Sequence, residues 1–250
     1  MKSLVIANWK MNPETLADAK KLFEATKKAA DKARGVAVVV APPAIFLHDL
    51  RASYRGKKLA FGIQNAYFEK SGSYTGETSL TQAHDAGAAW VLIGHAERRA
   101  SGETDGDVQK KVAAALALQM TPVLCIGETA RDSSGEHFNF VRKQLKIALA
   151  DVPASRLSKI VIAYEPVWAI GVAEAMSPHD MHEMAIFIRK TLFEIYGKPG
   201  MKTTILYGGS INEENAPAML KEGDVQGLLV GRASSDAKKI ALLLSAVEKA

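Results

Sequence analysis

Eight short apolar runs punctuate the chain, and each is followed by a segment with helical periodicity or by a loop that leads to one. The runs are continuous, rich in β-branched residues and closed by glycine, proline or polar positions, which is typical of buried parallel strands. They cover residues 4–7, 36–41, 59–64, 90–93, 122–126, 160–164, 203–206 and 228–230.

The segments between these runs carry amphipathic patterns. In the first of them Leu16, Leu22 and Phe23 recur at helical spacing, while the lysines fall mostly on the opposite side. Further along, Ser177 and Pro178 supply an N-cap and a first-turn proline for another long helix. Eight strand and helix units, with no linker and no change of composition, predict a (β/α)8 TIM barrel, an α/β fold, in a single domain over residues 1–250.

An open doubly wound α/β sheet is the competing architecture. Such a sheet needs its phosphate-binding glycines directly after the first strand. The sequence there reads Asn8-Trp9-Lys10, so the closed barrel is favoured.

The composition is that of an ordinary globular chain, with 48% hydrophobic and 24% charged residues among 250. No apolar run approaches the roughly 18 to 20 residues that a membrane-spanning helix needs, so we expect no membrane association. The segment Met1-Lys2-Ser3 leads directly into the first strand and leaves no room for a signal peptide, and the lone Cys125 cannot form an internal disulfide. These features predict a cytoplasmic protein.

The formal net charge of +5 is compatible with an anionic ligand. The basic residues are scattered over helix faces and do not form the stripe that nucleic-acid-binding proteins carry. We therefore expect no nucleic-acid partner.

Polar side chains stand where several predicted strands end. Asn8 and Lys10 follow the first strand, His95 and Glu97 the fourth, and Glu165 the sixth. The strands of a parallel barrel open on one face, which makes these residues neighbours. A carboxylate base, a donor that polarises a carbonyl and a cation that stabilises negative charge are what proton transfer beside a carbonyl needs.

Glu165 leaves its strand directly into a loop. Pro166 cannot donate to a sheet ladder and biases Glu165 toward extended backbone, which holds the acid on a stiff scaffold where pairing stops. Taken alone, Glu165 also fits a solvated strand-end acid, His95 a satisfied core histidine and Lys10 a surface lysine. Their occurrence together at successive strand exits favours a site.

Glycines follow the last two strands. The segments 208–210 and 231–232 read Gly-Gly-Ser and Gly-Arg, and they lie where the backbone N–H groups of a barrel can surround a phosphate dianion. His179 and His182 have a spacing that can hold a metal, but no third ligand is evident. We therefore expect an anion site and no metal.

Taken together, these segments closely resemble the triosephosphate isomerase family, and the resemblance spans the whole chain. Its most specific parts are residues 163–171, Ala-Tyr-Glu-Pro-Val-Trp-Ala-Ile-Gly, and residues 94–99, Gly-His-Ala-Glu-Arg-Arg. The other matching segments are 8–10, 64–65, 74–77, 125–128, 207–210 and 229–231.

The resemblance implies an enzyme that interconverts dihydroxyacetone phosphate and D-glyceraldehyde 3-phosphate through an enediolate. Glu165 would shuttle the proton, and uncharged His95 would donate to the substrate oxygens. Lys10, paired with Glu97 and flanked by Asn8, would stabilise the anion. The resemblance implies neither a metal nor an organic cofactor.

The same resemblance implies a phosphate site and a partner. The phosphate would be held mainly by the backbone N–H groups of Gly171, Ser210, Gly231 and Arg232. The loop 65–77 is long and rich in Gly, Ser, Tyr and Phe, and such loops usually bind a ligand or contact a partner. In the family this loop enters the second subunit, so we expect a homodimer with Thr75 near the neighbouring active site.

The chain departs from the family pattern within the site. Ala96 stands where a serine normally holds the glutamate, and Arg232 replaces a common second glycine while it keeps its backbone N–H. The lid, normally Gly-Thr-Gly-Lys, here reads Gly171-Val172-Ala173-Glu174. Ala173 lacks easy access to positive φ, which weakens closure if the closed lid needs that conformation. We therefore expect an isomerase with a weakened lid, because closure excludes water and protects the enediolate.

An alternative of another class is an isomerase-like barrel that binds sugar phosphate but is catalytically impaired or serves as a binding protein. Intact Lys10, His95 and Glu165 argue against it. A phosphosugar epimerase or a phosphate-dependent synthase should show strand-end metal ligands or another substrate pocket, and the sequence indicates neither.

Overall fold

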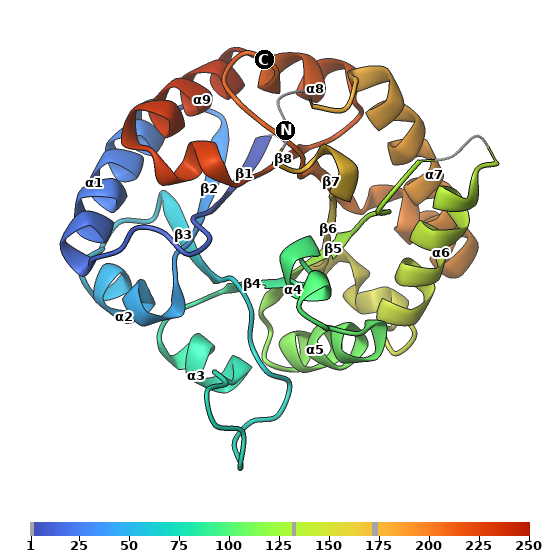
Figure 1. The fold of residues 1–250 in the computed structure, drawn as a ribbon, viewed down its shortest axis with the longest axis horizontal. Coiled ribbons are helices and arrows are strands. Elements are labelled where there is room, and N and C mark those ends of the chain that lie inside the picture. The colour runs from blue at the N-terminus through green and yellow to red at the C-terminus, as the bar shows by residue number, and fades with distance from the viewer. Residues whose placement is uncertain (1–2, 132–133, 172–174) are drawn as a thin grey trace.

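The structure is a computed structural model that describes residues 3–131, 134–171 and 175–250. Within those residues eight parallel strands pair in chain order and the last pairs with the first, so the sheet closes into a barrel (Figure 1). The strands are β1 (Ser3–Asn8), β2 (Val36–Ala41), β3 (Leu59–Ile63), β4 (Trp90–Ile93), β5 (Thr121–Ile126), β6 (Val161–Tyr164), β7 (Thr204–Tyr207) and β8 (Gly227–Val230). The predicted single-domain (β/α)8 barrel is confirmed, and the open doubly wound sheet is wrong. The atypical lid positions Val172, Ala173 and Glu174 lie outside the described residues.

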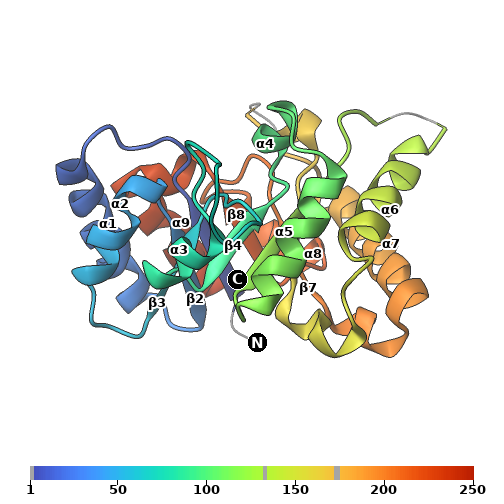
Figure 2. The ribbon, with the colours of Figure 1, turned by 90° about the horizontal axis from the view of Figure 1, so that it is seen from below.

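Most of the helices form an outer ring around the barrel, whereas the short α4 lies over the mouth of the barrel (Figures 1 and 2). The described helices are α1 (Leu16–Lys32), α2 (Ala44–Ala52), α3 (Leu80–Asp85), α4 (Ala96–Ala100), α5 (Asp105–Ala117), α6 (Glu136–Ala148), α7 (Pro178–Tyr196), α8 (Ala216–Glu222) and α9 (Ala237–Lys249). Short 3-10 turns are η1 (Ala154–Lys159), η2 (Val167–Ala169), η3 (Lys198–Lys202) and η4 (Arg232–Ser235).

Alternate residues of each strand face two different apolar layers. On β1, Ile6 belongs to the cluster inside the barrel, whereas Val5 and Ala7 belong to the larger core between the strands and the helices. Both faces of the sheet are therefore covered, which explains why the strands read as continuous apolar runs. The inner cluster consists of Ile6, Val39, Ala41, Leu92, Val123, Cys125, Val161, Ala163, Leu206 and Leu229.

Local capping residues fix where α7 and α5 begin. The Ser177 hydroxyl caps α7, as the sequence predicts, by accepting from the backbone N–H of Asp180. Helix α5 begins at Asp105, directly after Thr104, which forms a capping box with Asp107. The polar segment after β4 forms α4, which is five residues long and too short to leave a periodic signal.

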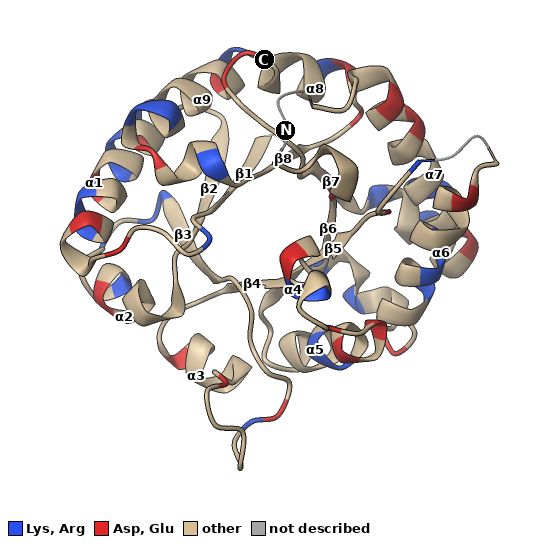
Figure 3. Ribbon diagram, in the orientation of Figure 1, with Lys and Arg blue, Asp and Glu red and all other residues tan. Residues whose placement is uncertain are grey.

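Charged side chains of both signs are distributed over the outer ring (Figure 3). This agrees with the expectation that the basic residues do not form one stripe, and the absence of a nucleic-acid partner stays a prediction. Among the described helices, none is both long enough and apolar enough to cross a membrane.

The two ends of the barrel differ. Helix α4, which follows the end of β4, lies at one end of the barrel (Figure 2). The chain between β3 and α3 projects from the rim of the barrel (Figure 1). Since all strands run in parallel, their carboxyl ends and the polar residues that follow them meet at the end that carries α4.

Candidate active site

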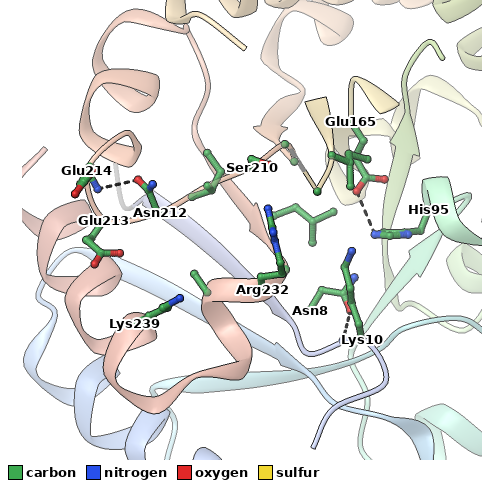
Figure 4. A pocket seen from close by; sticks show the side chains of 18 residues that line it. Asn8, Lys10, His95, Glu165, Ser210, Asn212, Glu213, Glu214, Arg232 and Lys239 are labelled. Carbon is green, nitrogen blue, oxygen red and sulfur yellow. Dashed lines mark hydrogen bonds and ion pairs between the residues drawn. The ribbon is translucent and has the colours of Figure 1, made fainter. Parts of the chain in front are cut away.

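One cavity of about 540 Å³ lies at the mouth of the barrel and gathers most of the predicted site (Figure 4). Its wall combines residues from the ends of β1, β4, β6, β7 and β8. The predicted residues that line it are Asn8, Lys10, His95, Glu165, Gly171, Ser210, Gly231 and Arg232. Glu97 lies instead on an adjoining cavity of about 320 Å³, which Asn8, Lys10 and His95 also line.

Lys10 follows β1 with a left-handed backbone, at φ 54°. This conformation is uncommon for a non-glycine residue and persists where its surroundings hold it. The Lys10 N–H donates to Asn8 Oδ1 at 3.0 Å. Gln64 Nε2 donates to the Lys10 carbonyl and to the Ala41 carbonyl, both at 2.9 Å. These bonds fix the direction in which the lysine leaves the chain.

The Lys10 ammonium is paired with Glu97. Lys10 Nζ lies 2.5 Å from Glu97 Oε1, and the two side chains are 25% and 57% exposed. An ion pair this exposed contributes at most about 1 kcal/mol to stability. We infer that Glu97 serves to orient the ammonium toward the cavity more than to stabilise the fold.

His95 is the N-cap residue of α4, and this position selects its tautomer. The backbone N–H of Glu97 donates to His95 Nδ1 at 3.2 Å. A nitrogen that accepts a hydrogen bond carries no proton, so the neutral imidazole has its proton on Nε2. That Nε2 lies 3.3 Å from Oε1 of Glu165. The helix start therefore aims an N–H donor into the cavity.

Glu165 follows β6, and its carboxylate is buried, with the residue 3% exposed. Its backbone N–H donates to the Ile126 carbonyl at 2.7 Å, which fixes the chain beside β5. Its Oε2 accepts from the backbone N–H of Ala96 at 3.4 Å, a long bond. Ala96 has no hydroxyl to add a second donor, so this residue holds the carboxylate through one weak backbone bond alone, beside the contacts of Glu165 with His95 and with the Cys125 thiol.

Two glycines let the neighbouring strands approach Glu165. A Cβ built at Gly208 would lie 2.7 Å from Glu165 Cγ, and one built at Gly127 would lie 1.9 Å from the Glu165 carbonyl oxygen. Both distances are below van der Waals contact, so only glycine fits beside the acid without displacement. The burial of Glu165 thus depends on Gly127, which follows β5, and on Gly208, which follows β7.

Gly171, Ser210 and Gly231, which the sequence assigns to phosphate binding, all line this cavity. Gly171 has φ 77°, a conformation that favours glycine. The Ser210 N–H donates to the Ala169 carbonyl at 3.2 Å, which ties η2 to the loop after β7. A phosphate can use this N–H only when that bond breaks.

A buried network behind Glu165 was not assigned a role from the sequence. Glu128 is 1% exposed and accepts from the Tyr164 hydroxyl at 2.8 Å and from Trp168 Nε1 at 2.9 Å. Burial, and then the Glu128 carboxylate, raise the pKa of Tyr164 well above its ordinary value. The network anchors both sides of Glu165 along the chain. Its members lie in two segments that the sequence analysis singled out, 125–128 and 163–171, but the pattern of those segments does not show that the side chains are bonded to one another.

Cys125 is not available for nucleophilic chemistry. Burial raises the pKa of its thiol, and the nearby Glu165 carboxylate raises it further, so the neutral thiol is favoured.

Among the residues that the structure describes, no group of three or more His, Cys, Asp or Glu side chains could hold a metal ion.

The predicted partner contact Thr75 lies apart from the cavity. It is exposed, in the loop that projects between β3 and α3. Gly76 and Glu77 of the same loop line the smaller cavity beside Glu97. The structure therefore places the loop 65–77 next to the site but does not bring Thr75 into it.

The fold and this arrangement define a (β/α)8 barrel enzyme in which a carboxylate, an imidazole and an ammonium line one cavity at the carboxyl ends of the strands. A family model for triosephosphate isomerase matches residues 3–247. The chain is 39% identical to a triosephosphate isomerase of Endomicrobium trichonymphae, with 97% of this chain and 98% of that protein covered. It is 39% identical to the one of Lawsonia intracellularis, over 98% of each chain, and 37% identical to the one of Aquifex aeolicus, over 98% of this chain and 99% of that protein. The chain belongs to the triosephosphate isomerase family.

Proposed function

We propose that this protein interconverts dihydroxyacetone phosphate and D-glyceraldehyde 3-phosphate. The observation that carries the proposal is the contact between Glu165 Oε1 and His95 Nε2, 3.3 Å apart, in a cavity that Lys10 also lines. A base, a neutral donor and a cation thus converge where one small carbonyl compound can meet all three.

The reaction moves one proton between adjacent carbons. Glu165 takes the proton from the carbon beside the substrate carbonyl, and the electron pair of that C–H bond forms the C=C bond of an enediolate. His95 donates its Nε2 proton toward the developing oxyanion, and Lys10 stabilises the negative charge. The protonated Glu165 then returns a proton to the neighbouring carbon, while the hydroxyl proton passes between the two oxygens through His95. No electron is gained or lost overall.

The substrate phosphate is assigned to the glycine-rich end of the cavity. Gly171, Ser210, Gly231 and Arg232 hold it through backbone N–H groups in this proposal, with Asn8 and Lys10 at the substrate carbons and oxygens. The positions of these residues on one cavity wall support the assignment. No metal or organic cofactor takes part in the proposed reaction.

The alternative, a barrel that binds sugar phosphate without isomerising it, is not favoured. Family membership and the intact Glu165, His95 and Lys10 geometry support catalysis. An isomerase assay in both directions, coupled to a triose phosphate dehydrogenase, tests this. We expect turnover by the wild-type chain and a much lower kcat for Glu165→Asp, whose carboxylate is one methylene shorter. A wild-type chain that binds inorganic phosphate but does not isomerise would support the alternative.

We further propose a cytoplasmic homodimer whose subunits, each one domain of residues 1–250, meet through the loop 65–77. Met11, after β1, is 93% exposed, Ile45, in the first turn of α2, is 79% exposed, and Tyr74 of the loop itself is 41% exposed. Apolar side chains this exposed favour burial against a second copy. Thr75 then approaches the active site of the neighbouring subunit.

A further inference from the structure

We propose that the Arg232 guanidinium binds the substrate phosphate directly and so adds a charged side-chain contact to a site otherwise built from backbone N–H groups. The inference rests on the proposed function, because it assigns the phosphate of that substrate to this end of the cavity. Arg232 begins η4, and Figure 4 shows its side chain extending into the cavity that Glu165 and Ser210 also line.

The backbone at Arg232 lies close to the reacting groups. A Cβ built at the preceding Gly231 would lie 3.0 Å from Lys10 Cε and 3.7 Å from Lys10 Nζ. The chain therefore passes within a few ångströms of the ammonium, and a long side chain from the next position reaches the same space. A substrate bound at Lys10 has its far end within reach of Arg232.

The start of η4 is fixed in place. The Ser234 hydroxyl donates to the Gly231 carbonyl at 2.7 Å and to the Asn8 carbonyl at 3.1 Å, and the Ser234 N–H donates to the Gly231 carbonyl at 2.8 Å. Ser234 itself is fully buried. These bonds tie η4 to the end of β1, so the guanidinium leaves from a defined point.

The chemistry of the side chain also favours this role. Among the described residues, the cations that line the cavity are Lys10, Arg232 and Lys239. An arginine presents a planar fork that matches two phosphate oxygens at once, whereas a lysine offers a point charge.

The test measures phosphate binding separately from turnover. Inorganic phosphate is titrated calorimetrically into the full chain and into the variants Arg232→Gln and Arg232→Lys, and kcat and KM are measured with both triose phosphates. The matched control is Arg55→Gln, since Arg55 is exposed between α2 and the amino end of β3, at the opposite end of the barrel. It removes the same charge without touching the cavity.

We expect Arg232→Gln to raise the Kd of phosphate and the KM of the substrates about tenfold, the scale of one lost charge-assisted hydrogen bond. Because the phosphate is bound equally in the ground and transition states, kcat should change less than KM. Arg232→Lys should fall between the wild type and Arg232→Gln, and Arg55→Gln should match the wild type. An unfolding midpoint for each variant checks that the fold is intact, and Arg232→Lys serves if the glutamine variant does not fold.

Two outcomes overturn the inference. One is a phosphate Kd for Arg232→Gln within twofold of the wild type, in a chain that isomerises normally; the proposed function then stands alone. The other is an equal loss of phosphate affinity in Arg55→Gln, which would show that the effect comes from the net charge of the protein and not from a contact of Arg232. If the wild type does not isomerise but Arg232→Gln still weakens phosphate binding, the proposed function fails and the anion contact stands.

Discussion

The Nε2 atom of His95 lies 3.3 Å from Oε1 of Glu165, and both side chains are buried, at 7% and 4% exposure. The proton is on Nε2 because Nδ1 already accepts the backbone N–H of Glu97. A donor and a base therefore face each other before substrate arrives. A carbonyl compound that enters between them meets the N–H with its oxygen and the carboxylate with its neighbouring carbon.

Replacement of His95 by glutamine should remove most of the activity. The glutamine amide cannot reproduce the Nε2–H position and cannot pass a proton between the two substrate oxygens, so we expect kcat to fall by about 10²- to 10³-fold with a smaller change in KM. His84→Gln, an exposed change on α3, is the control and should leave kcat unchanged. A His95→Gln variant with wild-type kcat would contradict the assigned role.

Gly208→Ala should displace the base. The new Cβ would lie 2.7 Å from Glu165 Cγ, so the acid must move, and a misplacement of this kind costs about a hundredfold in kcat. The matched control is Gly106→Ala on α5, where the nearest atom to the new Cβ is 3.7 Å away. We expect that change to keep kcat and to leave stability equal or slightly higher. Equal kcat for the two variants would show that Glu165 tolerates the added methyl group.

The fold should lose stability at alkaline pH because the buried phenol of Tyr207 keeps its proton in the folded state. Burial raises its pKa from 10.0 to about 12, and its oxygen accepts the Met176 N–H at 3.0 Å. The folded state therefore keeps the phenol proton where the unfolded chain has lost it. The stability from this group is complete below pH 10 and is lost as the pH rises toward 12, with about 1.4 kcal/mol gone at pH 11.

The measurement is urea unfolding of the wild type and of Tyr207→Phe at pH 9 and at pH 11. The lost hydrogen bond lowers the free energy of unfolding of the variant by the same amount at both pH values, and the other tyrosines affect both proteins equally. The change with pH in the difference between the two free energies of unfolding therefore reports the ionisation of Tyr207. We expect the advantage of the wild type to shrink by about 1.4 kcal/mol between the two values. A difference that does not change with pH would refute the linkage.

Restoration of the family's lid sequence should raise turnover. The triple variant carries Val172→Thr, Ala173→Gly and Glu174→Lys, and it returns a glycine to the position where positive φ is expected to be needed. If this lowers the free-energy cost of lid closure by about 1 kcal/mol, kcat should rise roughly fivefold. Release of methylglyoxal, the product of phosphate elimination from the enediolate, should fall at the same time. This prediction comes from the sequence alone. It is wrong if the wild type already turns over without elimination product and the triple variant is no faster.

The homodimer can be separated into subunits by charge. Ile45→Lys combined with Thr75→Arg places two cations in the proposed interface, and we expect light scattering to give 26.9 kDa where the wild type gives twice that mass. Leu242→Lys on α9, at another exposed apolar position outside that region, should leave the mass of the wild type unchanged. A wild type that is itself monomeric would contradict the proposed dimer.

The sequence by itself determined the barrel, and with it which strand-end residues lie near one another. Each apolar run is a local signal, and a closed parallel sheet sends every strand exit to one end, so Lys10, His95 and Glu165 become neighbours once the fold class is known. The expected start of α7 follows from Ser177 and Pro178 for the same reason, because capping is local chemistry.

Only the tertiary structure decided how those groups act. The tautomer of His95 depends on a short helix with no periodic signal, and the left-handed backbone of Lys10 is held by Gln64, which follows β3. The bond between Ser210 and Ala169 and the reach of Arg232 into the cavity likewise join residues that are distant in sequence. Hydrogen-bond direction and close approach are set by distances between separate strands, and a linear pattern carries no such distances.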